Sequence, residues 1–222
     1  MLTETETTMA KPPENALRSV LVGVALLGLV VGLVRLSGAL RTTPGTVLVG
    51  DSITALLLVD GAPPAIDPDG VEVVAVPGRT AQQMRATVDE LADKRPERVV
   101  VNLGTNDLLS GRSAAETNDD LAWIIRRFSR GTCVVVVTLN ERMVHPDRPQ
   151  LAADAAAVNR QLRWTAADAS AGVVDWAALV GVHDHAGDSL FPMTLDTVHP
   201  SISGRSALIE AYQRALSQAC PE

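Results

Sequence analysis

Two serines in this chain stand in the same setting, with a glycine and an aspartate immediately before the serine. One copy occupies residues 50–52 and the other occupies residues 187–189, where Leu190 completes Gly-Asp-Ser-Leu. A serine hydroxyl is a weak nucleophile at neutral pH and needs a base within hydrogen-bonding reach, oriented by a third group. The two copies can therefore be compared by the partners and the fold position that the rest of the sequence gives them.

The surrounding sequence favours Ser52. It follows an apolar, β-branched run and precedes another apolar stretch, so we expect it at the carboxyl end of a strand, with its amide at the start of a turn or helix. Ser189 follows no strand-like run, and Pro192 comes soon after it, which is typical of a loop. We predict that Ser52 is the nucleophile and that Ser189 is a turn residue.

His199 is the candidate base. The segment DTVHP places Asp196 three residues before His199 and Pro200 directly after it. A loop of that length lets the Asp196 carboxylate reach Nδ1 of the imidazole, which leaves Nε2 to face Ser52, and Pro200 biases His199 toward an extended backbone. Taken alone, the segment fits equally well a helix cap formed by Asp196 and Ser201 beside an unrelated histidine.

Two further segments supply hydrogen-bond donors. The third strand-like run ends in NLGTNDLL, which brings Asn106 to the same edge, and a side-chain amide can stabilise the oxyanion of acyl transfer. The second run ends in AVPGRT, where Gly78 can bring its amide close to a substrate without a Cβ in the way. No metal-binding pattern accompanies these residues.

Five short apolar runs alternate with longer helical patterns along the chain. The runs show no in/out alternation, which is typical of strands covered on both faces. Their alternation with helices predicts a parallel sheet between two helical layers, with ligands bound at the carboxyl ends of the strands. The strand-like runs cover residues 46–50, 71–76, 98–104, 132–139 and 172–176, and the helical patterns cover residues 80–94, 113–130, 150–169 and 202–219.

From about residue 46 to its end, the chain resembles the SGNH (GDSL-type) hydrolase family. Four residues occur in the chain order of that family's signature positions: Ser52, Gly78, Asn106 and His199. The resemblance implies a flavodoxin-like three-layer α/β/α sandwich with about five parallel strands. It also implies Ser52 as nucleophile, His199 as base, Asp196 as the group that orients the base, and an oxyanion hole formed by the Ser52 and Gly78 amides and the Asn106 side chain. No cofactor is implied.

These residues predict a serine esterase that hydrolyses carboxylic esters through an acyl-enzyme on Ser52. The substrate would be an acetyl ester of a carbohydrate or an acyl ester of a lipid, and the sequence does not separate the two. One alternative is an O-acyltransferase that uses the same residues on a cell-envelope glycan. The other is a non-catalytic binding module, which would be expected to lack one of the three catalytic side chains.

The N-terminal part of the chain has a different composition. Residues 19–34 are apolar without a polar face, lie between Arg18 and Arg35, and continue in small and apolar residues to residue 40. We predict a single membrane-spanning helix; a cleaved signal segment and a buried helix remain alternatives. The expected organisation is a polar tail at 1–18, the anchor or signal segment at 19–40, a linker at 41–45 and the hydrolase domain at 46–222. The catalytic domain would lie outside the cytoplasm, either anchored or secreted.

Charge and cysteine content exclude several classes of protein. The net charge is −7 and the basic residues do not cluster, which argues against nucleic acid as a partner. Cys133 and Cys220 are too few for a disulfide scaffold, but they can form one disulfide in an exported protein, and the sequence leaves this open. His183 and His185 have no third ligand placed by spacing, so we expect a polar loop there and no metal site. The oligomeric state is open.

Overall fold

A five-stranded parallel sheet forms the centre of the protein. The computed structural model describes residues 45–58, 64–66, 70–185 and 192–220, and within 183–185 only the backbone. The strand order is β2-β1-β3-β4-β5. The strands are β1 (Thr46–Gly50), β2 (Val71–Ala75), β3 (Arg98–Asn102), β4 (Cys133–Val137) and β5 (Gly172–Val174). The predicted parallel sheet with flanking helices is therefore confirmed.

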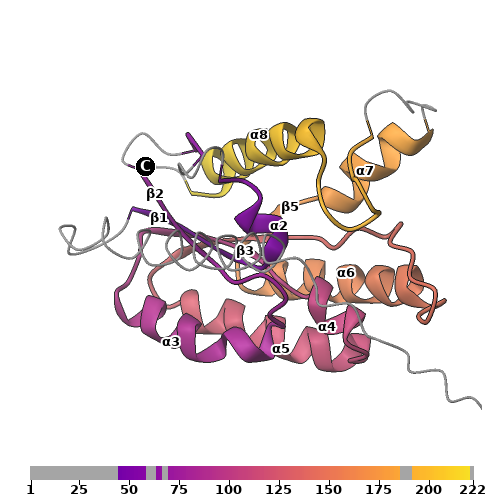
Figure 1. The fold of residues 1–222 in the computed structure, drawn as a ribbon. Coiled ribbons are helices and arrows are strands. Elements are labelled where there is room, and N and C mark those ends of the chain that lie inside the picture. Colours follow the sequence, from indigo (N-terminus) through magenta and orange to yellow (C-terminus); the bar gives the residue numbers. More distant parts are fainter. Residues whose placement is uncertain (1–44, 59–63, 67–69, 186–191, 221–222) are drawn as a thin grey trace, which may run out of the picture. The chain divides into compact units, whose positions relative to one another are not determined.

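Helices cover both faces of this sheet (Figure 1). One face carries α3 (Arg85–Asp93), α5 (Ala114–Phe128) and α6 (Leu151–Asp168), and the other carries α2 (Ser52–Ala55), α7 (Trp176–His185) and α8 (Ile202–Ala219). A 3₁₀ turn, η1 (Gln82–Met84), precedes α3, and a short helix, α4 (Thr105–Leu109), follows β3. The four predicted helical patterns correspond to α3, α5, α6 and α8.

The strands are apolar nearly throughout because each face of the sheet packs against a separate core. In β1, Val47 and Val49 pack with α3 and α5, whereas Leu48 packs with α2 and α8 on the opposite face, and all three are fully buried. Burying one such side chain contributes about 1.5–3 kcal/mol. This two-sided burial is the physical reason that the strands lack the alternation of a half-exposed sheet.

Two predictions about the end of the sheet are wrong. The last strand ends at Val174, and Trp176, expected at the end of that strand, begins α7. The segment that contains His183 and His185, expected as a polar loop, is the last turn of the same helix. The reason lies in Asp175, whose Oδ1 accepts the N–H of Ala178 at 3.1 Å and so caps a helix directly after the strand.

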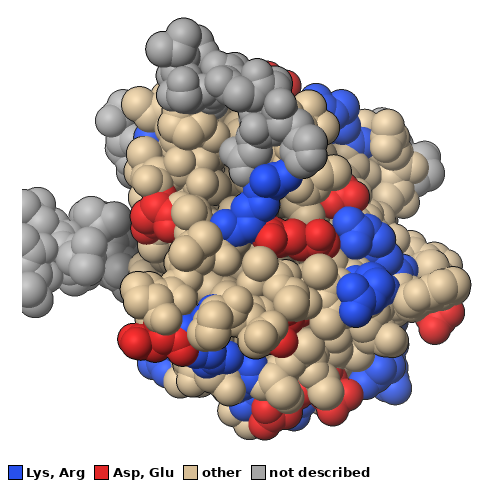
Figure 2. Space-filling view, turned by 90° about the vertical axis from the view of Figure 1, so that its right-hand side faces the viewer, with Lys and Arg blue, Asp and Glu red and all other residues tan. Residues whose placement is uncertain are grey.

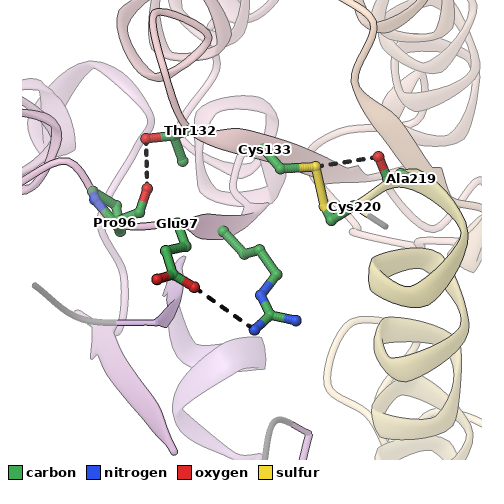
Figure 3. Close-up of a disulfide and its surroundings, with 7 residues drawn as sticks. Pro96, Glu97, Thr132, Cys133, Ala219 and Cys220 are labelled. Carbon is green, nitrogen blue, oxygen red and sulfur yellow. Dashed lines mark hydrogen bonds and ion pairs between the residues drawn. A yellow bond between two sulfur atoms is a disulfide. The ribbon is translucent and has the colours of Figure 1, made fainter. Parts of the chain in front are cut away.

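The disulfide that the sequence left open is formed (Figure 3). It joins Cys133, the first residue of β4, to Cys220, directly after α8, across 5.8 Å between the Cα atoms. Close by, Thr132 Oγ1 donates to the carbonyl of Pro96 at 2.8 Å. The disulfide therefore attaches the end of the last helix to the amino edge of the sheet.

The predicted N-terminal segments lie outside the described residues. They comprise the tail at 1–18, the anchor or signal segment at 19–40 and nearly all of the linker at 41–45. Within the part of the chain that the structure describes, no helix combines the length and apolar character needed to cross a membrane.

Candidate active site

The carboxyl ends of the central strands lie level with one another. Gly50 at the end of β1 is in register with Ala75 of β2 and with Asn102 of β3. The segments that follow these strands therefore emerge side by side at one edge, the right-hand side of Figure 1. Figure 2 views this edge, where acidic and basic side chains are interspersed over the described surface. The described part of this face shows no continuous basic patch of the kind that nucleic-acid binding requires.

Ser52 is the first residue of α2 and follows β1 by a sharp turn. Asp51 caps the helix, since its Oδ1 accepts the N–H of Ile53 at 2.9 Å. A Cβ on Gly50 would lie 1.9 Å from Thr54 Oγ1, so the strand can turn into α2 only because residue 50 has no side chain. The turn leaves Ser52 half-buried at the carboxyl edge of the sheet.

Ser52, His199 and Asp196 form a continuous hydrogen-bonded line. Ser52 Oγ lies 3.0 Å from His199 Nε2, and His199 Nδ1 lies 2.7 Å from Asp196 Oδ2. The structure thus brings together the three side chains predicted to form the triad, with each ring nitrogen on the expected partner. The alternative in which Asp196 and Ser201 only cap a helix fits less well, because Ser201 alone caps α8, accepting the N–H of Gly204 at 3.1 Å.

A tight loop before α8 holds the histidine. Leu195 donates its N–H to the His199 carbonyl at 2.8 Å, and Thr197 between them has a left-handed φ of 67°. Asp196 Oδ1 accepts the N–H groups of Val198 and His199 at 3.0 and 2.7 Å. Desolvation raises the pKa of Asp196, but the hydrogen bonds from the ring and from the two amides outweigh it and hold this pKa below its ordinary value. The carboxylate is therefore kept ionised beside the ring.

Gly78 lies in the loop that follows β2, and Asn106 lies in α4, which follows β3. Gly78 has a φ of +76°, and apart from its chain neighbours no heavy atom of the described residues lies within 4 Å of a Cβ built there. The backbone conformation, and not local crowding, therefore favours a glycine. Asn106 lies in α4, and its Nδ2 donates to Asp51 Oδ2 at 2.9 Å and to the carbonyl of Arg79 at 3.3 Å. The second hydrogen bond is long and is the weaker of the two.

Asp51 is a buried carboxylate that sequence reasoning did not assign to the site. Its side chain is fully buried, with Oδ1 on the Ile53 amide and Oδ2 on the Asn106 side chain. Burial raises its pKa to about 6, although the Ile53 hydrogen bond and nearby His199 act in the opposite direction. The Gly-Asp-Ser motif contains Asp51 itself, so the signal was present. Its function as an acceptor for Asn106 could be found only from the fold.

Two other expectations fall on residues that carry no structural description. Ser189 lies outside the described residues, so its predicted role in a turn stays a prediction. The side chains of His183 and His185 are likewise not described, although their backbone belongs to α7.

Solved structures of similar fold include several hydrolases. A GDSL-like lipase from Bacteroides thetaiotaomicron has a TM-score of 0.69 at 19% identity, over 82% of this chain and 94% of that one. A lipase/acylhydrolase from Enterococcus faecalis has a TM-score of 0.63 at 24% identity, over 79% and 96%. A catalytic mutant of an acetylxylan esterase from Geobacillus stearothermophilus has a TM-score of 0.60 at 18% identity, over 79% and 96%. At these identities the likeness is one of fold.

The sequence itself identifies the family. No curated protein matches the chain. The family model of the GDSL-like lipases and acylhydrolases, in contrast, matches residues 48–207, which run from the middle of β1 to the first turns of α8. With this match, and with the sheet order and the Ser52–His199–Asp196 line described above, the chain belongs to the GDSL-like lipase/acylhydrolase family.

Proposed function

We propose that this protein hydrolyses carboxylic esters with Ser52 as the nucleophile. The observation that carries the proposal is the hydrogen-bonded line from Ser52 Oγ through the His199 ring to Asp196, with distances of 3.0 and 2.7 Å, at the carboxyl edge of the sheet. A serine, a histidine and a carboxylate in this geometry are the groups that acyl transfer through a covalent intermediate needs.

In the proposed acylation step, Ser52 Oγ attacks the ester carbonyl carbon while its proton passes to His199 Nε2. The carbonyl oxygen becomes an oxyanion, stabilised by the backbone amides of Ser52 and Gly78 and by the Asn106 side chain. Asp196 keeps the proton on Nδ1 and stabilises the imidazolium that forms. When the intermediate collapses, the bond to the alcohol oxygen breaks and that oxygen takes the proton from Nε2. An acyl group remains on Ser52.

Water completes the proposed cycle. It attacks the acyl carbon while His199 Nε2 takes one of its protons, and the second oxyanion binds the same three donors. Collapse then breaks the bond to Ser52 Oγ, which recovers its proton from Nε2 and releases the acid. The same donors act in both halves of the reaction because both pass through a tetrahedral oxyanion.

The test is an ester series on the full chain beside Ser52→Ala. Neighbours of similar fold include an acetylxylan esterase and lipases, so p-nitrophenyl esters from acetyl to palmitoyl cover both expected substrate classes. We expect turnover that Ser52→Ala abolishes while the circular dichroism spectrum stays unchanged. Activity confined to acetyl would indicate a carbohydrate acetyl ester, and activity on long chains would indicate a lipid. Turnover that survives in Ser52→Ala would overturn the proposal.

We also propose that the catalytic domain lies outside the cytoplasm. The support is the disulfide between Cys133 and Cys220, since disulfides persist in oxidising compartments and are rare in the cytosol. Alkylation of intact cells with a maleimide reagent, before and after reduction, tests this. We expect the two cysteines to react only after reduction. Reaction without reductant would contradict an extracytoplasmic domain.

A further inference from the structure

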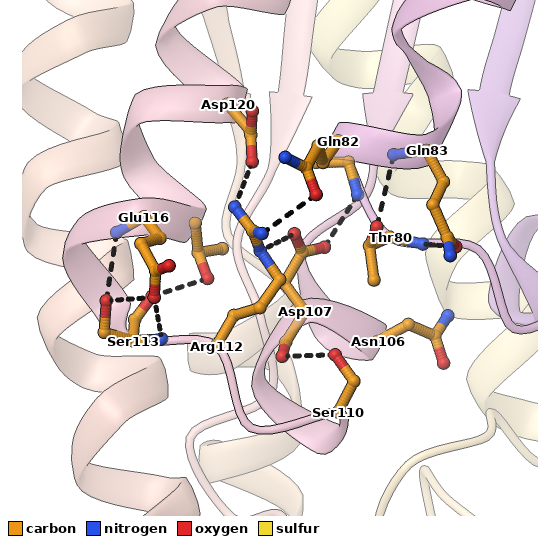
Figure 4. Close-up of polar contacts among 12 residues, drawn as sticks. Thr80, Gln82, Gln83, Asn106, Asp107, Ser110, Arg112, Ser113, Glu116 and Asp120 are labelled. Atoms are coloured by element: carbon orange, nitrogen blue, oxygen red, sulfur yellow. Dashed lines mark hydrogen bonds and ion pairs between the residues drawn. The ribbon is translucent and has the colours of Figure 1, made fainter.

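The side chain of Arg112 joins three elements beside the site (Figure 4). Its Nε lies 3.1 Å from Asp107 Oδ1 in α4, and its Nη2 lies 2.5 Å from Asp120 Oδ2 in α5. Its Nη1 donates to Gln82 Oε1 in η1 at 3.0 Å. The arginine thus bridges two carboxylates, each at most 4% exposed, and the turn that follows the Gly78 loop.

Asp107 connects the loop that carries Gly78 to the helix that carries Asn106, the two outer oxyanion donors of the proposed reaction. It follows Asn106 directly in α4, and its Oδ2 accepts the N–H of Ala81 at 2.7 Å. Ala81 lies three residues after Gly78, so one carboxylate fixes the distance between the Gly78 loop and the helix that carries Asn106. The position of both donors relative to Ser52 therefore depends on where the Asp107 carboxylate lies.

Asp107 needs a cation because it is fully buried. Desolvation raises its pKa, whereas the Ala81 amide and Arg112 lower it. A buried carboxylate without a partner is strongly unfavourable, and it moves or takes up a proton. Asp120 has a second partner, Arg85 at 2.5 Å, whose guanidinium lies over the ring of Trp123. Loss of Arg112 would thus leave Asp107, and not Asp120, without its ion pair.

We propose that Arg112 is a positioning residue for the oxyanion hole. Its guanidinium fixes the Asp107 carboxylate between α4 and the Gly78 loop, and so sets the separation of the Gly78 amide and the Asn106 side chain. The inference rests on the proposed ester hydrolysis, because it concerns the donors that stabilise its transition state. Misplacing such donors weakens transition-state binding more than substrate binding.

The test compares Arg112→Met and Arg112→Lys with a matched control, Arg127→Met. Arg127 also bridges two carboxylates, those of Asp89 and Asp93 at 2.6 and 2.5 Å, but at the far end of α5. In Arg112→Met we expect kcat to fall about 10- to 100-fold, less than the loss of a whole oxyanion donor, with KM changed less than about twofold. Arg112→Lys should recover most of kcat, and Arg127→Met should keep the wild-type kcat.

The outcomes separate this inference from the proposed function. Wild-type kcat in a folded Arg112→Met variant, or an equal loss in Arg127→Met, overturns the inference and leaves ester hydrolysis intact. Absence of Ser52-dependent turnover in the wild type overturns both. If Arg112→Met does not fold, Arg112→Lys and Arg112→Gln carry the test. We then expect a lower kcat in Arg112→Gln than in Arg112→Lys, and wild-type kcat in both would contradict the inference.

Discussion

At the scale of single residues, two buried carboxylates hold the segment around Asn106 in place. Asp51 accepts the Asn106 amide at 2.9 Å, and Asp107, the next residue, accepts the Ala81 amide at 2.7 Å. Both carboxylates are fully buried, and burial is the largest cause that raises the pKa of each. The charge of Asp107 adds to the raised pKa of Asp51, and the charge of Asp120 adds to that of Asp107. Buried negative charge therefore orients the neutral side-chain amide of Asn106, and burying that charge lowers the stability of the folded protein.

Asp51 gives a stability prediction with a definite sign. With its pKa raised from 3.8 to about 6, the folded protein binds a proton in that interval that the unfolded chain does not bind. The contribution of Asp51 to stability is complete below about pH 3.8 and is lost as the pH rises through about 6. Asp51→Asn lacks this titration. Its free energy of unfolding relative to the wild type should rise by roughly 1–2 kcal/mol between pH 5 and 7.5.

Urea unfolding of both proteins at the two pH values measures this difference. Asp51→Asn should also lower kcat, because an amide at residue 51 cannot accept from both the Ile53 and the Asn106 N–H groups. A stability difference that does not change with pH would show that Asp51 titrates normally in the folded protein.

The residues of the site divide into those that sequence could predict and those that it could not. Ser52 and His199 stand in short motifs, and the rule that ligands bind at the carboxyl ends of strands was enough to place Ser52. Arg112 has no such signal, because its three partners come from separate elements and only the folded chain brings them together. The spacing of residues along the chain does not predict contacts of this kind, because they depend on distances between separate elements of the folded protein.

At the scale of elements, the turn from β1 into α2 decides how Ser52 is presented. Gly50→Ala should destabilise the protein by about 1–3 kcal/mol, because the added Cβ would lie 1.9 Å from Thr54 Oγ1 and force the turn to open. It should also lower kcat by moving Ser52. Gly181→Ala, in α7, is the matched control. Among the described residues outside its own helix backbone and chain neighbours, the nearest atom to a Cβ there is Arg142 Nε at 4.0 Å, and a helix interior favours alanine over glycine.

Urea unfolding and ester turnover of these two variants check the prediction. A Gly50→Ala protein as stable and as active as Gly181→Ala would show that the turn adapts without cost.

The regular elements were predictable because their patterns are long, and the short ones were not. The helical pattern of α8 spans its full 18 residues, so its existence and register follow from sequence. In contrast, α7 was not predicted, because its apolar first turns directly follow a three-residue strand. Periodicity alone cannot distinguish a short apolar helical segment from a buried strand. The cap at Asp175 was the available signal.

At the scale of the whole domain, the disulfide and the candidate site lie at opposite edges of the sheet. Cys133 begins β4 and Cys220 follows α8, whereas Ser52 and His199 meet where the strands end. The bridge closes a loop of 87 residues, and a disulfide of this kind contributes about 2–4 kcal/mol to stability. It connects the last helix to the sheet without touching the reacting groups.

Replacing both cysteines by serine should therefore lower the stability of the protein and leave its ester turnover nearly unchanged. We expect the free energy of unfolding to fall by about 2–4 kcal/mol, with kcat within about twofold of the wild type below the unfolding transition. Urea unfolding paired with ester turnover measures both quantities. Unchanged stability, or a large loss of kcat in the folded variant, would contradict the separation of the bridge from the site.

The central claim is that Ser52 is the nucleophile, and covalent labelling tests it most directly. A p-nitrophenyl alkylphosphonate reacts with an activated serine and leaves a stable phosphonyl group on the attacking oxygen. Mass spectrometry of the digested full chain should find this group on the peptide that contains Ser52, at one equivalent per chain, and on no peptide of Ser52→Ala. A label on Ser189, or equal labelling of Ser52→Ala, would contradict the account.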